Sequence, residues 1–172
     1  MLALQSDNID ILLSLGSNLG DRKGFIDSAY KLINQTGLIN NCRLSSFYES
    51  EPVGFSDQPY FINACLRGTT KLPPNLLIYF AKSLEYLCGR VVRKRWHERE
   101  LDIDIIMYGD CVLNLRHLIL PHPRLHERKF VLMPSNEIAG EMINPVNGKS
   151  ISLMLDECSD NSIVRIFENH RN

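Results

Sequence analysis

The sequence predicts an α+β fold in which helices cover one face of an antiparallel sheet. Two observations support this prediction. In two segments apolar residues recur every three or four positions, which is typical of amphipathic helices. Four strand-like segments surround them in the order β-α-β-β-α-β, the arrangement of a ferredoxin-like core. We expect this core and a C-terminal extension to form a single domain over residues 1–172.

The core begins with a buried strand at 9–15. The turn G-S-N-L-G-D-R follows it, and Asp21 is a suitable N-cap for a helix over 22–36. Gly37 suits the end of that helix, because glycine readily adopts the left-handed conformation found there. The remaining expected elements are strands at 43–49 and 60–70, a helix from Pro74 to Gly89, a strand at 101–107, a short helix near 132–139, and further elements in 151–157 and 162–167.

The composition limits the classes of function. With 44% hydrophobic and 23% charged residues the chain resembles an ordinary globular protein, and no apolar run approaches the ~20 residues of a membrane span. A net charge of −1 gives no general attraction to nucleic acid or to anionic lipid. Five cysteines without a C-x-x-C pair, and an N-terminus unlike a signal peptide, predict a cytoplasmic protein with reduced thiols.

Two aspartates, Asp102 and Asp104, interrupt the strand expected at 101–107. Because side chains alternate between the faces of a strand, both carboxylates project from the same side, about 7 Å apart. Two like charges at this spacing repel each other unless a cation lies near them. Carboxylate oxygens suit Mg²⁺, which also binds substrate phosphates. A solvent-exposed sheet face would explain the same alternation without a metal.

The segment before this strand is strongly basic, with five cations and one carboxylate between residues 90 and 99. Guanidinium groups bind phosphate oxygens in pairs, so a cationic loop beside two carboxylates is what a metal–triphosphate site requires. The sequence contains no P-loop and no G-x-G-x-x-G, so such a site would be built from side chains. An ordinary solvated loop is the alternative.

Four blocks of sequence, spread over about residues 9 to 146, match one known family. They are L-S-L-G-S-N-L-G-D-R, S-S-F-Y-E-S-E-P-V-G with D-Q-P-Y-F-I-N-A, R-W-x-x-R-x-L-D-I-D-I-I-M-Y-G, and L-P-H-P-R-L-H-E-R-K-F-V-L-M-P. In this order they resemble the 6-hydroxymethyl-7,8-dihydropterin pyrophosphokinase family. The resemblance implies the ferredoxin-like fold and the transfer of pyrophosphate from ATP to the pterin hydroxymethyl group, with release of AMP, in folate biosynthesis.

For the nucleotide, the resemblance implies two Mg²⁺ ions that Asp102 and Asp104 hold against the triphosphate, beneath a lid at 89–99. Residues implied to bind ATP or to neutralise the transferring group are Glu85, Arg90, Arg93, Arg95, Trp96, Arg99, Ile105, His122 and Arg128. The family usually has R-W-G-P-R where this chain has R-W-H-E-R, so the lid lacks a glycine and a proline. Lys82 stands where some members have a glutamine that contacts phosphate.

For the pterin, the resemblance implies a ring stacked between Phe61 and Phe130, a hydrogen bond from Asn63, and main-chain contacts between Ser50 and Val53. A planar heterocycle gains from such stacking, and an amide can both donate to its edge and accept from it. Each residue also has a structural alternative, because a phenylalanine is more often a core residue and an asparagine often satisfies the backbone. Association with other folate enzymes is a further expectation.

Two other classes of function fit parts of the pattern. Ferredoxin-like sheets often bind RNA on their open face, but two aspartates there repel phosphate in the absence of a metal. A metal-dependent nuclease would use the D-x-D pair and the arginines, and would leave the two phenylalanines and the asparagine without a role. Salt-dependent RNA binding without Mg²⁺, or phosphodiester cleavage without ATP, would distinguish these classes from a pyrophosphokinase.

Overall fold

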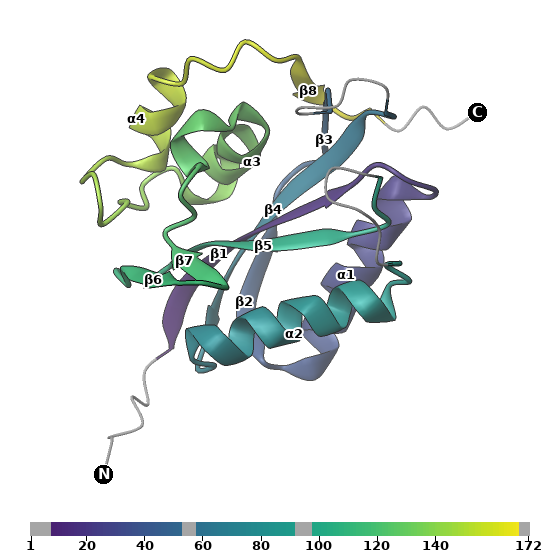
Figure 1. Cartoon of the computed structure of the whole chain (residues 1–172), viewed down its shortest axis with the longest axis horizontal. Helices are drawn as coiled ribbons and strands as arrows, with labels where there is room; N and C mark the ends of the chain where they lie inside the picture. Colours follow the sequence, from purple (N-terminus) through teal and green to yellow (C-terminus); the bar gives the residue numbers. More distant parts are fainter. Residues whose placement is uncertain (1–7, 53–57, 92–97, 169–172) are drawn as a thin grey trace.

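The computed structural model describes residues 8–52, 58–91 and 98–168, and Figure 1 shows their arrangement. Its elements are β1 (Ile9–Ser17), α1 (Arg22–Thr36), β2 (Ile39–Leu44), β3 (Tyr48–Ser50), β4 (Phe61–Thr70), α2 (Pro74–Leu87), β5 (Asp102–Tyr108), β6 (Leu113–Leu115), β7 (Leu118–Leu120), a 3-10 turn (Leu125–Glu127), α3 (Lys129–Ala139), α4 (Ile151–Asp156) and β8 (Val164–Ile166). The order from β1 to β5 confirms the predicted core. The Asp21 side chain caps α1 by accepting the N–H of Gly24 at 3.0 Å, and Gly37 ends the helix in the left-handed conformation.

The main sheet has the order β5-β1-β4-β3-β8, and β2 also pairs with β4. All of these pairs are antiparallel, as predicted. The long strands β1 and β4 lie at the centre, so their side chains are buried on both faces over most of their length. β5 lies at the edge of the sheet next to β1, which leaves one side of its backbone without a neighbouring strand.

The two faces of the sheet are covered differently (Figure 1). α1 and α2 cover one face, over a core to which alternate residues such as Leu13, Leu15 and Ile103 contribute. On the other face α3 and α4, from the C-terminal extension, cover a second core that includes Leu12 and Cys65. This second core does not extend to the part of the sheet that holds Asp102 and Asp104, so that part is not sealed by apolar packing.

One predicted strand is wrong in its bounds. The strand expected at 43–49 is split into β2 and β3, because at the break side-chain bonds take over part of the pairing, and only the Ser45 N–H still donates to the carbonyl of Cys65 at 2.9 Å among the described main-chain bonds there. The Ser45 hydroxyl accepts the N–H of Cys65 at 2.9 Å, and the N–H of Ser46 donates to the Glu137 carboxylate at 2.9 Å. Serine side chains compete with regular pairing in this way. The β6–β7 hairpin was not predicted, since strands of three residues are too short to show a period.

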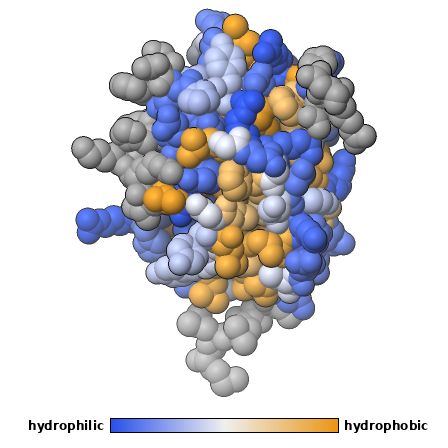
Figure 2. Space-filling model, turned by 90° about the vertical axis from the view of Figure 1, so that its right-hand side faces the viewer, coloured by the Kyte–Doolittle hydropathy of each residue, from blue (hydrophilic) through white to orange (hydrophobic). Residues whose placement is uncertain are grey.

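Some apolar side chains remain on the surface of the helical layer. Tyr79, Tyr86 and Leu87 of α2 are each more than half exposed. Figure 2 shows a band of apolar residues between hydrophilic margins on the side of the molecule that lies to the right in Figure 1. No helix in the described ranges is long and apolar enough to cross a membrane.

Candidate active site

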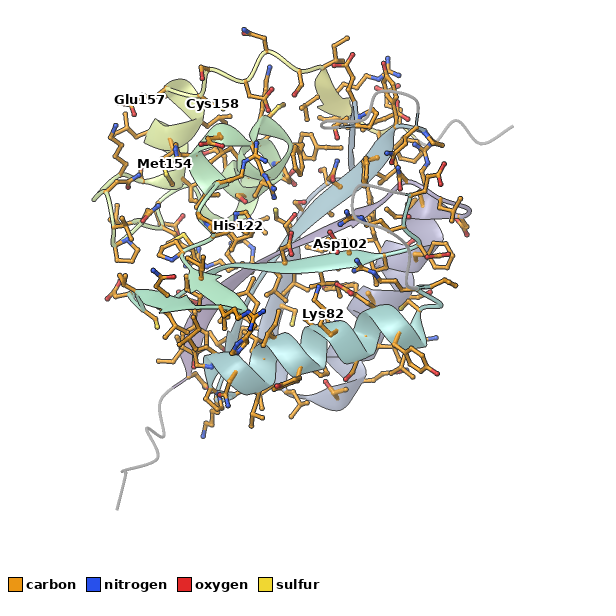
Figure 3. The ribbon with its side chains drawn as sticks, viewed as in Figure 1. Lys82, Asp102, His122, Met154, Glu157 and Cys158 are labelled. Carbon is orange, nitrogen blue, oxygen red and sulfur yellow. The ribbon has the colours of Figure 1, made fainter. Side chains whose placement is uncertain are left out.

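The open part of the sheet brings the predicted carboxylates and the predicted asparagine onto one face. Asp102 lies opposite Gly16 of β1, and Gly16 lies opposite Asn63 of β4. Directly opposite residues of antiparallel strands point to the same side, so all three share the face away from α1 and α2. With strands spaced by roughly 4.8 Å, the Cα atoms of Asp102 and Asn63 are about 10 Å apart. Figure 3 shows Asp102 on β5, with Lys82 and His122 near the same strand.

Asp102 is surrounded by cationic side chains. Its Oδ1 accepts a hydrogen bond from Arg90 at 2.6 Å and its Oδ2 accepts one from Arg99, while the Lys82 Nζ lies 4.0 Å away. Burial opposes ionisation of this carboxyl, but the charges of Arg99, Lys82 and Arg90 outweigh it and lower the pKa of Asp102. Asp102 is therefore ionised at neutral pH and fully engaged by arginines.

Asp104 differs from Asp102 in its surroundings. Within the described residues its carboxylate forms no hydrogen bond and no ion pair at contact distance. Burial, and then the charge of Asp102, raise the pKa of Asp104, and the more distant Lys82 and Arg128 only partly offset this. A desolvated carboxylate beside a second carboxylate is a position where a cation is stabilising. The described residues contain no cluster of three His, Cys, Asp or Glu side chains suited to a metal, so a cation here would take its remaining ligands from water or from a substrate.

Side chains of α2 satisfy the free edge of β5. Glu85 is only 3% exposed, and its Oε1 accepts the main-chain N–H of Ile103 at 2.7 Å. Lys82 Nζ donates to the carbonyl of Ile103 at 3.3 Å and to Glu85 Oε1 at 2.6 Å, and Arg90 donates to Glu85 Oε2. Glu85 and Lys82 thus take the place of a neighbouring strand at Ile103, the residue between the two aspartates. Glu85 lies beneath the candidate site rather than on its surface.

His122 faces the same region from the turn after β7. Its main-chain N–H donates to the carbonyl of Ile106 at 2.9 Å, which holds the turn against β5. Its Nδ1 accepts the N–H of Arg124 at 3.2 Å, so the proton of the neutral ring resides on Nε2. Burial and the charges of Arg128 and Arg124 lower the pKa of His122 to about 4. At neutral pH this side chain is an uncharged hydrogen-bond donor.

Arg128 has an unused hydrogen-bonding atom. It directly precedes α3, its guanidinium lies over the Phe130 ring with 5.7 Å to the ring centre, and burial lowers its pKa. Its Nε is buried and has no hydrogen-bond partner within the described part of the chain. A buried guanidinium nitrogen without a partner is costly unless an anion binds it. The arginine therefore favours an anion on this face, near Asp104.

Three of the expected pterin residues, Ser50, Phe61 and Asn63, lie together on β3 and β4. Asn63 is 2% exposed, and its Nδ2 donates to the Ser50 hydroxyl at 2.8 Å. A Cβ atom at Gly16 would lie 3.1 Å from Asn63 Oδ1 and 3.8 Å from the Phe61 ring. Glycine at this position therefore allows the amide and the ring to lie close over β1. Phe61 and Phe130 are both partly exposed.

Some expected residues are placed differently or lie outside the described ranges. The side chain of Ile105 is buried in the core beneath α2, so its contact with a ligand is limited to its backbone at the edge of the sheet. The outer residues of the expected lid, Arg90 and Arg99, both reach Asp102. Val53, Arg93, Arg95 and Trp96 lie outside the residues that the structure describes.

Sequence reasoning missed a role for Asn18, which it interpreted only as part of a turn. This side chain is almost fully buried; its Oδ1 accepts the N–H of Arg99 at 2.8 Å and its Nδ2 donates to Gln58 at 3.1 Å. The Asn18 N–H also donates to the carbonyl of Arg99 at 3.1 Å. Asn18 thus ties the end of β1 to the segments that lead into β4 and β5. In the sequence, only the position of Asn18 within the G-S-N-L-G-D-R block could have indicated this role.

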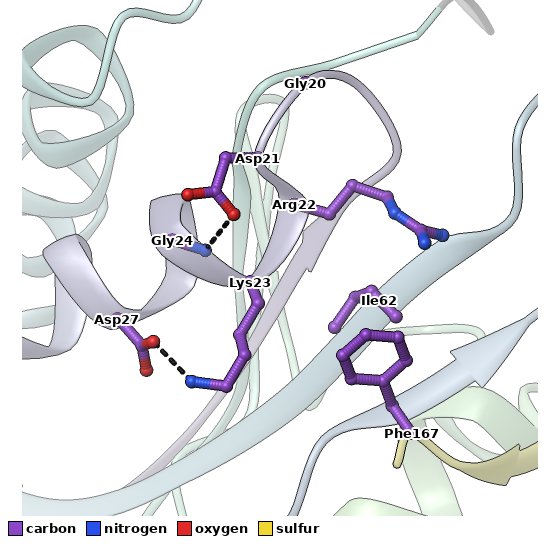
Figure 4. A pocket seen from close by; sticks show the side chains of 8 residues that line it. All are labelled: Gly20, Asp21, Arg22, Lys23, Gly24, Asp27, Ile62 and Phe167. Atoms are coloured by element: carbon purple, nitrogen blue, oxygen red, sulfur yellow. Dashed lines mark hydrogen bonds and ion pairs between the residues drawn. The ribbon is translucent and has the colours of Figure 1, made fainter. Parts of the chain in front are cut away.

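A pocket of about 380 Å³ lies elsewhere, at the start of α1 (Figure 4). Ile62 lines it and points toward the α1 and α2 face, away from Asp102. The charged groups around it are already satisfied: Lys23 pairs with Asp27 at 2.5 Å, and Arg22 donates to the carbonyl of Tyr60 at 2.6 Å. This pocket does not contribute to the candidate active site.

Comparison with known proteins gives a consistent result. A family model described as 7,8-dihydro-6-hydroxymethylpterin-pyrophosphokinase (HPPK) matches residues 12–140. The 2-amino-4-hydroxy-6-hydroxymethyldihydropteridine pyrophosphokinase of Haemophilus influenzae is 35% identical over 158 residues, which cover 92% of this chain and 98% of that protein. Folic acid synthesis protein fol1 of Pneumocystis carinii is 40% identical over 157 residues, which cover 91% of this chain but 21% of that protein.

Among solved structures, a triple mutant of Plasmodium falciparum HPPK-DHPS is similar, with a TM-score of 0.71 and 15% identity. The similarity covers 91% of this chain and 42% of that one. At this identity the likeness shows a shared fold. The chain therefore spans nearly the whole of the H. influenzae protein but less than half of the longer relatives.

Proposed function

The chain belongs to the 7,8-dihydro-6-hydroxymethylpterin-pyrophosphokinase family, and we propose that its candidate active site transfers pyrophosphate from ATP to the hydroxymethyl group of the dihydropterin. The observation that carries this proposal is the position of Asp104, a desolvated carboxylate without a partner in the described residues. It lies beside Asp102 on the face that also holds Asn63. A polyphosphate bound over the aspartates would thus lie next to a pterin bound at the asparagine.

Asp102 and Asp104 are the residues that would hold Mg²⁺. The raised pKa of Asp104 and the lack of a third ligand among the described side chains fit a cation that takes its remaining oxygens from the triphosphate. When bound, the metal supplies charge neutralisation on the phosphate oxygens. The family resemblance implies two Mg²⁺ ions, and we propose the same number here.

Arginines and a neutral histidine would bind the phosphates. Arg90 and Arg99 lie at contact distance from Asp102, and the unpartnered Nε of Arg128 favours an oxygen of the transferring group. His122 would donate from Nε2 without carrying charge. Such groups stabilise charge that develops on phosphate oxygens, and the reaction needs no covalent intermediate. Arg93, Arg95 and Trp96 remain expectations from the resemblance.

Other nucleotide contacts would come from β5 and α2. Backbone groups of Ile105 face the same edge as those of Ile103 and are suited to hydrogen bonds with a planar base. Glu85 would support ATP binding indirectly, because it holds Arg90 and the edge of β5.

The pterin would bind between β3, β4 and the start of α3. Asn63 would donate to the ring edge and accept from it once its amide is released from Ser50 or shared with it. Phe61 and Phe130 would stack on the ring, and main-chain groups from Ser50 to Val53 would complete the polar contacts. Glycine at position 16 lets Asn63 and Phe61 lie close over β1, in the position that this binding mode requires.

Two wider expectations remain proposals. Association with another folate enzyme is supported by the Plasmodium relative, whose name joins HPPK to DHPS and of which this chain matches 42%. A cytoplasmic location is supported by five cysteines that are all free.

Incubation of the protein with ATP, Mg²⁺ and reduced hydroxymethylpterin tests the proposal. We expect AMP to form in equal amount with the pterin diphosphate, and only when all three components are present. An Asp104→Asn variant serves as the control that separates this site from a contaminating enzyme. If the wild-type protein forms no AMP, or cleaves phosphodiesters without ATP, the proposal is wrong.

A further inference from the structure

We infer that the C-terminal segment 158–167 is a strap that sets the distance between the two walls of the pterin site, and that Asp160 is its positioning residue. The inference rests on the proposed function, since it concerns the site where the pterin would bind. The segment lies beyond residues 12–140, which the family model matches, and none of the sequence blocks that carry the resemblance includes it.

One end of the strap holds the start of α3. Asp160 Oδ2 accepts the main-chain N–H of Lys129 at 3.0 Å, and its Oδ1 accepts the N–H of Ser162 at 2.9 Å. The residue in the N-cap position of α3 is Arg128, whose own side chain makes no capping bond. Asp160 therefore caps the helix from a distant point in the chain, directly between Arg128 and Phe130.

The other end of the strap holds β3. Residues Ile163 and Glu51 exchange two bonds: the Glu51 N–H donates to the Ile163 carbonyl at 3.4 Å, and the Ile163 N–H donates to the Glu51 carboxylate at 3.3 Å. In β8, Val164 lies opposite Ser50 and Arg165 lies opposite Glu49, whose carboxylate accepts from the arginine at 2.7 Å. β8 thus covers the edge of the strand that carries Ser50.

The two ends join residues that are expected to bind the same ligand. Asn63 donates to Ser50, and Ser50 pairs with Val164 of β8. Four residues before Val164, Asp160 accepts the N–H of Lys129, the residue before Phe130. Figure 1 shows this segment running from α4 across to β8 beside β3. Farther along α3, Glu137 accepts from the Tyr48 hydroxyl at 3.0 Å, so the helix is fixed to β3 at a second point. Two attachment points define how α3 is oriented over the sheet.

Asp160 is only partly exposed, and its environment fits a constant structural charge. Burial opposes its ionisation, but hydrogen bonds from Ser162 and Lys129 lower its pKa. A carboxylate that caps a helix is typically stabilising, so the strap also contributes to stability. A residue that only stabilises the fold would not change ligand affinity while the variant is fully folded. A positioning residue would change it under the same conditions.

The test compares Asp160→Ala with Asp156→Ala. Asp156 is an exposed carboxylate at the end of α4, four residues earlier, and makes no described contact with α3 or β3. Pterin affinity is measured by equilibrium fluorescence, and exchange of the Lys129 and Phe130 amides by hydrogen–deuterium exchange. We expect Asp160→Ala to weaken pterin binding about five- to tenfold, as for loss of a helix cap, and to speed exchange at Lys129. Asp156→Ala should change neither.

Asp160→Asn should restore most of the affinity, because its amide oxygen still accepts the Lys129 N–H. If Asp160→Ala is unfolded, Asp160→Glu replaces it; this variant keeps the charge but moves the bond by one methylene, and is expected to weaken pterin binding. Unchanged pterin affinity in a folded Asp160→Ala or Asp160→Glu protein, even with faster exchange, would overturn the inference. Absence of pterin binding by the wild type would instead overturn the proposed function, and this inference with it.

Discussion

The carboxylate of Glu85 accepts the main-chain N–H of Ile103 at 2.7 Å, at the one residue of β5 that separates Asp102 from Asp104. The helix α2 is thereby fixed to the edge strand at the point where its two carboxylates must be held. We therefore expect the stability of the fold and the proposed activity to depend on the same buried side chain, and substitutions can separate the two contributions.

Replacement of Glu85 is expected to destabilise the fold. In Glu85→Ala the Ile103 N–H and two cationic groups lose their acceptor, at a cost of about 3 kcal/mol in the free energy of unfolding. Glu85→Gln keeps the acceptor for Ile103 and should lose less. Urea unfolding measures both. Glu141→Ala is a matched control, because Glu141 also pairs with an arginine but is exposed, and its loss should cost less than about 1 kcal/mol. Equal stability of the three variants would contradict this account of the strand edge.

Replacing either aspartate should lower activity to a similar extent, but the two variants should differ in the free energy of unfolding. Asp104→Asn removes a charge that burial and Asp102 disfavour, so the unfolding midpoint should stay the same or rise. Asp102→Asn removes the charged acceptor that Arg90 and Arg99 share and should lower the free energy of unfolding by about 1–3 kcal/mol. Both variants are expected to lower the rate of AMP formation on the order of 10³-fold. A stable, active Asp104→Asn protein would exclude this carboxylate from the reaction.

Gly16→Ala tests the close approach of Asn63 to β1. The added Cβ would lie 3.1 Å from Asn63 Oδ1, so the amide must shift by a few tenths of an ångström. We expect the KM for the pterin to rise about tenfold, with an unchanged unfolding midpoint. Asn63→Ala, which removes the amide, should raise it about 10- to 100-fold. If both variants bind the pterin as the wild type does, the ring binds elsewhere.

His122 gives a defined dependence of stability on pH. In the folded protein its pKa is about 4, against 6.5 for an ordinary histidine, so between these values the unfolded chain binds more protons. The free energy of unfolding therefore falls as the pH is lowered from 6.5 toward 4, and this contribution is fully present above pH 6.5. His122→Asn retains an acceptor for the Arg124 N–H but does not titrate. The difference in unfolding free energy between wild type and variant should shrink over this range; parallel curves would show that His122 is not buried in its neutral form.

Much of the fold could be predicted because its signals are local. α1 begins and ends where Asp21 and Gly37 predicted, since both caps act through neighbouring backbone groups. The break between β2 and β3 could not be predicted, because Ser46 bonds to Glu137, which is 91 positions away in sequence. Its place depends on how α3 packs against the sheet.

The site shows the same division. The alternation of a strand was sufficient to place Asp102 and Asp104 on one face. It gave no sign that Glu85 and Lys82 would bond the backbone of Ile103, because that contact requires α2 to lie along the free edge of β5. Asn18 was missed for a similar reason: its partners Gln58 and Arg99 come from segments distant in sequence.

Arg90 and Arg99 both donate to Asp102, and under the proposed function this pairing would couple the binding of the divalent cation to the binding of the nucleotide triphosphate. Under the proposed function, a polyphosphate bound alone would compete with Asp102 for the guanidinium groups, and a divalent cation bound alone would compete with them for the carboxylate. With both bound, Asp102 would hold the cation, and Arg90 and Arg99 would be available to the phosphates. Metal and nucleotide should therefore enter as a thermodynamically coupled pair, each increasing the affinity for the other by the same factor.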